Sequence, residues 1–164
     1  MNREEVLRLL NDDPYAQRLL FSSIPARLAY VALDGTPRVI PIAFHFDGSR
    51  FVLGTIDFSA KVRAIQANPA VALTVDTDDQ PPLVLMVRGT AEVSFVDGVL
   101  PEYLEANRKM FSAAAFPAFE AEVRRLYDRM ARIDITPTWA KVLDFETRAP
   151  EAVMQLAAAK GLPE

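Results

Sequence analysis

The chain lacks the residues on which several large classes of functional site depend. Its 164 residues include no cysteine and a single histidine, His45. This excludes thiolate nucleophiles, iron–sulfur clusters and zinc sites built on sulfur, and it also excludes a metal site that needs several imidazoles. No metal site is therefore expected. No run of about 18 apolar residues is present either, so the sequence predicts no membrane span.

A surplus of basic residues is missing as well. Lysine and arginine total 18 and aspartate and glutamate total 22, which leaves a net charge of −4. A nucleic-acid partner is not expected, because such binding normally needs a basic face. The N-terminal stretch Met1–Glu5 is charged and does not read as a secretory signal. These features predict a cytoplasmic protein whose partner is a small molecule.

The first half of the chain alternates between tight turns and apolar runs. Two short helices are predicted within residues 3–21, separated at Asp13-Pro14. Asp34-Gly35 and Asp47-Gly48 then mark turns between three strands. The predicted strands cover residues 28–33, 38–46 and 51–56. A helix over 58–67, a strand over 71–75 and a long strand over 83–96 follow, and Gly89 is expected to mark a bulge in the last of these.

The second half is predicted to begin with helices and to end with strands. Residues 99–131 have helical spacing in two pieces around Phe116-Pro117, and residues 133–145 form one or two closing strands broken at Pro137. A short helix follows Pro150. The pattern predicts a mainly β protein with peripheral helices, arranged as an antiparallel barrel. We expect a single domain over residues 1–164, with a helical insertion at 97–131 and a C-terminal tail at 148–164.

The first candidate for chemistry is the segment from Thr55 to Arg63. A strand that ends in a hydroxyl residue runs here into a helix start bearing Ser59, Lys61 and Arg63. The free amides and positive dipole of a helix N-terminus, together with a hydroxyl and a cation, suit one phosphate monoester. The alternative is that Ser59 only caps the helix while Lys61 and Arg63 face water.

The second candidate is the strand Arg38-Val39-Ile40-Pro41-Ile42. Pro41 cannot donate a ladder hydrogen bond, so it belongs at a sheet edge or a gap, where neighbouring amides can meet a ligand. An ordinary edge strand is the alternative. His45 raises a similar choice between a proton donor at a cleft and an ordinary strand residue. Trp139 could cover a ligand across an interface or lie in the barrel core.

Taken in order, these elements resemble the pyridoxamine-phosphate-oxidase-like family of flavin-binding split barrels. The resemblance covers residues 24–96 and is carried by the following segments: Arg27–Leu33, Asp34-Gly35-Thr36-Pro37, Arg38–Ile42, Phe51–Thr55, Ser59-Ala60-Lys61, Asn68–Leu73 and Val87–Val93. It implies an antiparallel split β-barrel and a homodimer with flavin mononucleotide (FMN) at the subunit interface.

The resemblance also implies roles for particular residues. The strand with Arg38, Val39, Ile40 and Pro41 would lie along the flavin ring, and Thr55 would lie near it. Ser59 and Lys61 would hold the phosphate. Arg63 is a further cofactor-binding candidate from the residue pattern alone, as a second cation at the same helix start. An FMN-dependent oxidoreductase that transfers hydride to or from a small molecule is the activity implied. No catalytic side chain, substrate or electron partner is assigned.

Departures from the family pattern leave two alternatives open. An arginine that pyridoxamine phosphate oxidases usually carry is replaced by Ala60, a glutamine is replaced by Val84, and the tail from Pro150 has neither arginine nor histidine. These differences argue against a vitamin B6 substrate. One alternative is an F420-dependent reductase of the same fold, with Lys61, Arg63 and Arg88 beginning a cationic track. The other is a flavin-binding or sensing module without turnover.

Overall fold

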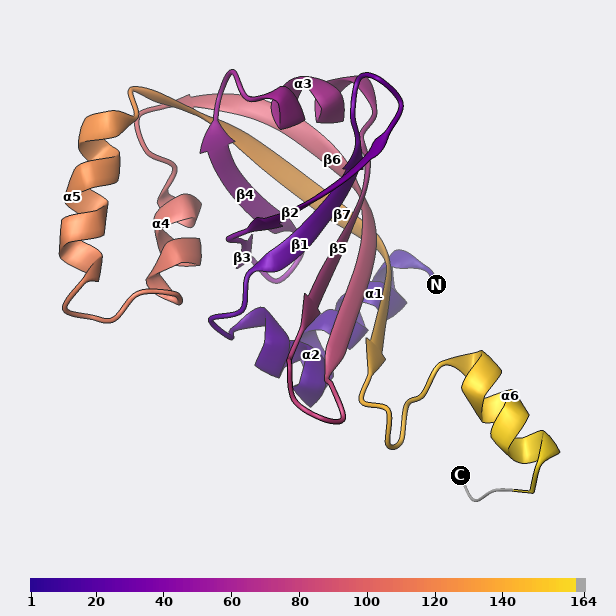
Figure 1. Cartoon of the computed structure of the whole chain (residues 1–164). Helices are drawn as coiled ribbons and strands as arrows, with labels where there is room; N and C mark the ends of the chain where they lie inside the picture. Colours follow the sequence, from indigo (N-terminus) through magenta and orange to yellow (C-terminus); the bar gives the residue numbers. More distant parts are fainter. Residues whose placement is uncertain (162–164) are drawn as a thin grey trace.

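A computed structural model describes residues 1–161 (Figure 1). Its seven strands form one antiparallel sheet in the order β2-β1-β5-β6-β7-β4-β3. The strands are β1 (Ala26–Val31), β2 (Pro37–Ile42), β3 (His45–Phe46), β4 (Phe51–Ile56), β5 (Ala70–Asp76), β6 (Val84–Asp97) and β7 (Arg129–Leu143). The helices are α1 (Arg3–Asp12), α2 (Pro14–Leu20), α3 (Ala60–Ala67), α4 (Pro101–Arg108), α5 (Phe116–Leu126) and α6 (Glu151–Ala159).

The sheet curls without closing, because its edge strands β2 and β3 stand at opposite ends of the strand order. Figure 1 shows the strands wrapped into an open barrel with helices at its periphery. The prediction of a mainly β, antiparallel split β-barrel with peripheral helices is therefore confirmed.

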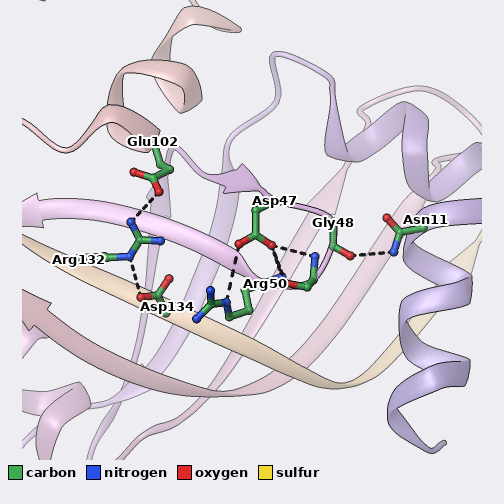
Figure 2. Close-up of polar contacts among 8 residues, drawn as sticks. Asn11, Asp47, Gly48, Arg50, Glu102, Arg132 and Asp134 are labelled. Carbon is green, nitrogen blue, oxygen red and sulfur yellow. Dashed lines mark hydrogen bonds and ion pairs between the residues drawn. The ribbon is translucent and has the colours of Figure 1, made fainter.

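Both predicted tight turns are present. Gly35 has φ +80°, and the backbone amide of Ala32 donates to the carbonyl of Thr36 across the β1–β2 turn. In the β3–β4 turn, a carboxylate oxygen of Asp47 accepts the amides of Ser49 at 2.8 Å and Arg50 at 2.7 Å (Figure 2). The side chain of Asn11 in α1 donates to the carbonyl of Gly48 at 2.9 Å, which ties this turn to the N-terminal helix.

The single strand expected over residues 38–46 is wrong. The structure divides it into β2, which pairs with β1 at one edge of the sheet, and β3, which pairs with β4 at the other. Phe44 lies between them, is 1% exposed, and packs on Phe51 with ring centroids 5.8 Å apart. The chain therefore crosses from the β2 edge of the sheet to the β3 edge at the buried residue Phe44. Pro41 lies in edge strand β2, as expected for a residue without an amide proton.

Two expectations for the last strand are also wrong. Strand β7 begins at Arg129, so residues 129–131 are not helical, and it continues through Pro137 without a break. The register between β6 and β7 shifts between Arg88 and Gly89, opposite Pro137, and this irregularity accommodates the missing amide proton. A Cβ on Gly89 would lie 2.6 Å from the carbonyl oxygen of Thr136, so the bulge predicted there depends on glycine.

Helices cover the barrel at separate places. Leu10, Leu19 and Leu20 of α1 and α2 are fully buried against the barrel core. Helices α4 and α5 lie in the expected insertion and share a smaller cluster around Leu104 and Phe116. In residues 1–161, no helix is both long and apolar enough to cross a membrane.

Candidate functional site

A cleft of about 330 Å³ opens where the barrel is split. Its walls come from the end of β2, the end of β4, the first turn of α3 and the helical insertion. The lining residues are Ile40, Pro41, Ile42, Ala43, Gly54, Thr55, Ile56, Lys61, Tyr103, Asn107 and Tyr127. The cleft therefore joins the two segments that the sequence singled out for chemistry.

Lys61 and Thr55 are in direct contact in this cleft. The Nζ atom of Lys61 donates a hydrogen bond of 2.9 Å to Oγ1 of Thr55. Burial lowers the pKa of the Lys61 ammonium group, because a low-dielectric surrounding disfavours its charged form. An anion in the cleft would supply the countercharge that this ammonium group lacks.

Ser59 stands immediately before α3, but its side chain does not cap the helix. Its Oγ atom is buried and makes no hydrogen bond to any described residue. The backbone amides at the start of α3 therefore donate no hydrogen bond to this side chain. An unpaired buried hydroxyl is costly unless a ligand or water satisfies it, so Ser59 fits a phosphate oxygen better than it fits the capping alternative.

Five of the predicted site residues lie outside the set that lines the cleft: Arg38, Val39, Ser59, Arg63 and Trp139. The guanidinium of Arg38 pairs with Asp34 at 3.1 Å, and Val39 is 65% exposed. Arg63 is exposed on α3.

Trp139 lines a second hollow, on the outer face of the sheet, where the guanidinium of Arg88 lies 4.5 Å from its ring centroid. It is half-buried there and is absent from the barrel core cluster. His45 is half-buried and is not among the residues lining the cleft.

Sequence reasoning did not identify the residues that the insertion contributes to the cleft. Tyr103 and Asn107 on α4 and Tyr127 after α5 line the cleft, although they are distant in sequence from the other walls. A Cβ on Gly54 would lie 2.8 Å from Cβ of Tyr103, so the tyrosine rests on the bare backbone of β4. Burial, with a further contribution from Tyr127, raises the pKa of the Tyr103 phenol, which therefore remains a hydrogen-bond donor at neutral pH. A glycine inside a strand was the one available signal for this close approach.

A charged cluster anchors α4 beside the cleft. The guanidinium of Arg132 on β7 donates to Glu102 of α4 and to Asp134 of β7, both at 2.7 Å (Figure 2). Hydrogen bonds to Asp134 and Glu102 raise the pKa of Arg132 despite its burial. The cluster fixes the turn of helix that precedes Tyr103. Elsewhere, the described residues contain no group of three His, Cys, Asp or Glu side chains placed to hold a metal ion.

Comparisons with known proteins agree with this architecture. An F420 reductase of known structure has 34% sequence identity, with a TM-score of 0.60 over 76% of this chain and 94% of the other. The conserved hypothetical protein Rv2991 from Mycobacterium tuberculosis is 18% identical, with a TM-score of 0.60 over 85% of this chain and 89% of that one. HutZ, the heme storage protein from Vibrio cholerae, is 18% identical, with a TM-score of 0.57 over 79% and 92%. The last two likenesses concern the fold alone.

The family assignment depends on a match over most of the chain. No protein with a curated description matches it significantly. The family model described as pyridoxamine 5'-phosphate oxidase, however, matches residues 13–143, which include every strand of the barrel. The family resemblance recognised in the sequence is confirmed, and the chain belongs to the pyridoxamine 5'-phosphate oxidase family of split barrels.

Proposed function

We propose that this protein is an oxidoreductase that binds a flavin-type cofactor in the cleft and anchors the cofactor's phosphate at the start of α3. One observation carries the proposal: Ser59 Oγ is buried and unpaired, two residues before a half-buried Lys61. A hydroxyl, a cation and the free amides of a helix N-terminus are the donor set that a phosphate requires.

The residues on hand fit such a cofactor. Ser59 and Lys61 would hold the phosphate, and the apolar side chains of Ile40 and Pro41 would lie against the ring. When bound, a flavin or deazaflavin supplies hydride chemistry of its own, so the protein needs no strong acid–base pair. Tyr103 and Tyr127 narrow the cleft, exclude water and offer hydroxyl groups to a small substrate.

Two cofactors compete for this assignment. FMN is favoured by the cleft, because Lys61 is the one cation among its lining residues and one cation suits a single phosphate. F420 is favoured by a different observation, namely the 34% identity to an F420 reductase. Its longer anionic tail would have to extend past the cleft toward Arg63, which is exposed on the same helix.

The proposed assembly is a homodimer with a cofactor at each side of the interface. Trp139 supports this arrangement because it lies on the outer face of the sheet and not in the cleft of its own chain. It can cover a flavin edge only across an interface between two copies.

Titration of FMN and of F420 into the purified full-length protein tests the proposal. Removal of one charge-assisted contact in Lys61→Ala should weaken binding by about 1.5–3 kcal/mol, or about 10- to 150-fold. Ser59→Ala should weaken binding as well. Arg8→Ala is the matched control, because it removes an exposed cation on α1. If Lys61→Ala binds FMN as tightly as the wild type does, and F420 as tightly as the wild type does, the phosphate assignment is overturned.

Turnover separates the enzyme from a binding or sensing module. The reduced nicotinamides NADH and NADPH should bleach the blue absorbance of bound FMN, and air should restore it. For F420, the corresponding readout is oxidation of reduced F420 in the presence of small acceptors. A cofactor that binds tightly but never cycles would assign the protein to the module class.

A further inference from the structure

Helix α6 is apolar and uncovered. From Glu151 to Ala159 its only charged residue is Glu151, and none of its residues is buried within the part of the chain that the structure describes. Val153 is 54% exposed and Leu156 is 58% exposed. An isolated helix of this length is marginal in water, because most helices gain their stability from packing an apolar face. Another surface must therefore cover it.

The turn before α6 is well built and directs the helix away from the barrel. A carboxylate oxygen of Asp144, which is 8% exposed, accepts the amides of Glu146 at 3.0 Å, Thr147 at 2.8 Å and Arg148 at 2.7 Å. The guanidinium of Arg148 then pairs with Asp13 at the start of α2. Figure 1 shows α6 projecting from the end of β7, beyond the body of the barrel. The helix is thus presented outward from a fixed base.

A surface complementary to this helix exists on the same chain. On the outer face of β1, β2, β5, β6 and β7, a hollow of about 460 Å³ is lined by apolar side chains that include Ala29, Ala72, Met86 and Trp139. Its rim carries Arg27, Arg88 and Lys141, of which Arg27 is already paired with Asp76 at 2.8 Å. The apolar lining matches the apolar side chains of α6, and the rim matches Glu151, the charged residue at the start of the helix.

We propose that α6 is an exchanged arm that packs into the outer-face hollow of a second copy of this chain. Leu156 and Val153 would contact Met86 and Trp139 of the other copy, and Glu151 would face its basic rim. The exchange is reciprocal, so it gives a closed two-fold dimer without a free arm. This inference rests on the homodimer proposed above but not on the identity of the cofactor.

Crosslinking tests the contact directly, because the chain has no cysteine. Two full-length single variants, Leu156→Cys and Met86→Cys, are mixed and oxidised mildly. We expect a disulfide-linked heterodimer on a non-reducing gel. A mixture of Gln155→Cys and Met86→Cys should give at most a tenth of that product, because Gln155 lies on the polar side of α6 with Glu151. Equal products from the two mixtures would overturn the proposal.

The dissociation constant of the dimer and the fluorescence of Trp139 separate the role of α6 from the existence of the dimer. Leu156→Glu should raise the dissociation constant of the dimer at least tenfold, and Gln155→Glu should leave it within about twofold. Trp139 is the only tryptophan, so acrylamide quenching of its emission should rise in Leu156→Glu.

Three outcomes would contradict the proposal in different ways. If the wild type is a dimer and Leu156→Glu changes neither its dissociation constant nor the acrylamide quenching of Trp139, the exchanged arm is overturned and the homodimer stands. A monomeric wild type would overturn both. If the wild type is a monomer that sediments with phosphatidylcholine–phosphatidylglycerol vesicles, and Leu156→Glu does not sediment with them, α6 binds a lipid surface instead.

Discussion

Lys61 and Thr55 meet at the junction between β4 and α3, with 2.9 Å between Nζ and Oγ1. The contact joins the first turn of α3 to the end of β4, and both side chains line the cleft. Because burial lowers the pKa of Lys61, this contact alone does not fully replace the water that the ammonium group has lost.

The pH dependence of cofactor binding should report on Lys61. A phosphate needs the ammonium form, so affinity should fall as pH rises through a pKa below the usual 10.5 of lysine. The Lys61→Arg variant keeps its charge to higher pH. Its affinity should therefore persist at pH values where that of the wild type falls. Dissociation constants measured from pH 7 to pH 10 for both proteins check this, and parallel curves would contradict it.

Gly54→Ala should disturb the fold and the cleft together. The added methyl group would lie 2.8 Å from Cβ of Tyr103 and 2.9 Å from its ring, so α4 must move. We expect a loss of about 1–3 kcal/mol in the free energy of unfolding, the usual cost of overpacking. Urea unfolding measures it. In a Tyr103→Gly background the cost of Gly54→Ala should shrink, and an undiminished cost would show that the contact is not its cause.

The parts of the cleft that were predictable from the sequence are local in the chain. Thr55, Ser59 and Lys61 fall within one strand-to-helix junction, so their chemistry shows in a short segment. Tyr103 and Asn107 reach the same cleft only through tertiary packing of the insertion, which no periodicity encodes. The strand-to-helix end of the cleft was therefore predictable from the sequence, whereas the contribution of Tyr103 and Asn107 was not.

The same difference between local sequence and tertiary packing explains which parts of the fold could be predicted. Asp34-Gly35 and Asp47-Gly48 specify their turns through their own backbone and side chains. The division at Phe44 could not be predicted locally, because an apolar residue between two strand segments reads as more strand. Its position is decided by burial against Phe51, a contact of the assembled barrel.

Arg132→Met should destabilise the protein because it leaves two carboxylates without their shared donor. The side chains of Arg132, Glu102 and Asp134 are 20%, 28% and 14% exposed, so the cluster is partly shielded from water. We expect a loss of about 2–3 kcal/mol, below the cost of breaking a fully buried pair. The matched control is Arg124→Met, whose pair with Glu120 is more exposed and should contribute less than about 1 kcal/mol.

The lowered pKa of Glu102 determines how the stability of the protein should change as pH falls. Burial alone would raise the pKa of Glu102, but the hydrogen bond and charge of Arg132 outweigh it and lower that pKa below 4.5. The stabilisation from this ionised group is therefore complete above about pH 4.5 and is lost as pH falls through the lowered pKa. In Arg132→Met, Glu102 has lost its cation, so protonation of Glu102 as pH falls should stabilise the folded state instead. If both proteins lose stability equally between pH 5 and pH 3, the cluster does not have this role.

Lys109 should make stability rise with pH on the alkaline side. Its Nζ atom donates to the carbonyl of Leu20 at 3.0 Å and lies 4.0 Å from the ring centroid of Phe44, and burial lowers its pKa to about 8. Between about pH 8 and the unfolded value of 10.5, the unfolded chain binds more protons at this position than the folded chain, so unfolding becomes less favourable as pH rises. The side chain is partly solvated, so we expect a rise of about 1 kcal/mol.

The Lys109→Met variant isolates this effect. Lys61 and Tyr103 also have shifted pKa values, but they are present in both proteins, so the difference between the two stability curves belongs to Lys109. Methionine removes the titration and keeps most of the apolar stem, while the carbonyl of Leu20 loses its donor. Urea unfolding at intervals from pH 7 to pH 10.5 should show the wild type gaining stability relative to the variant. A constant difference across that range would mean that Lys109 keeps an ordinary pKa in solution.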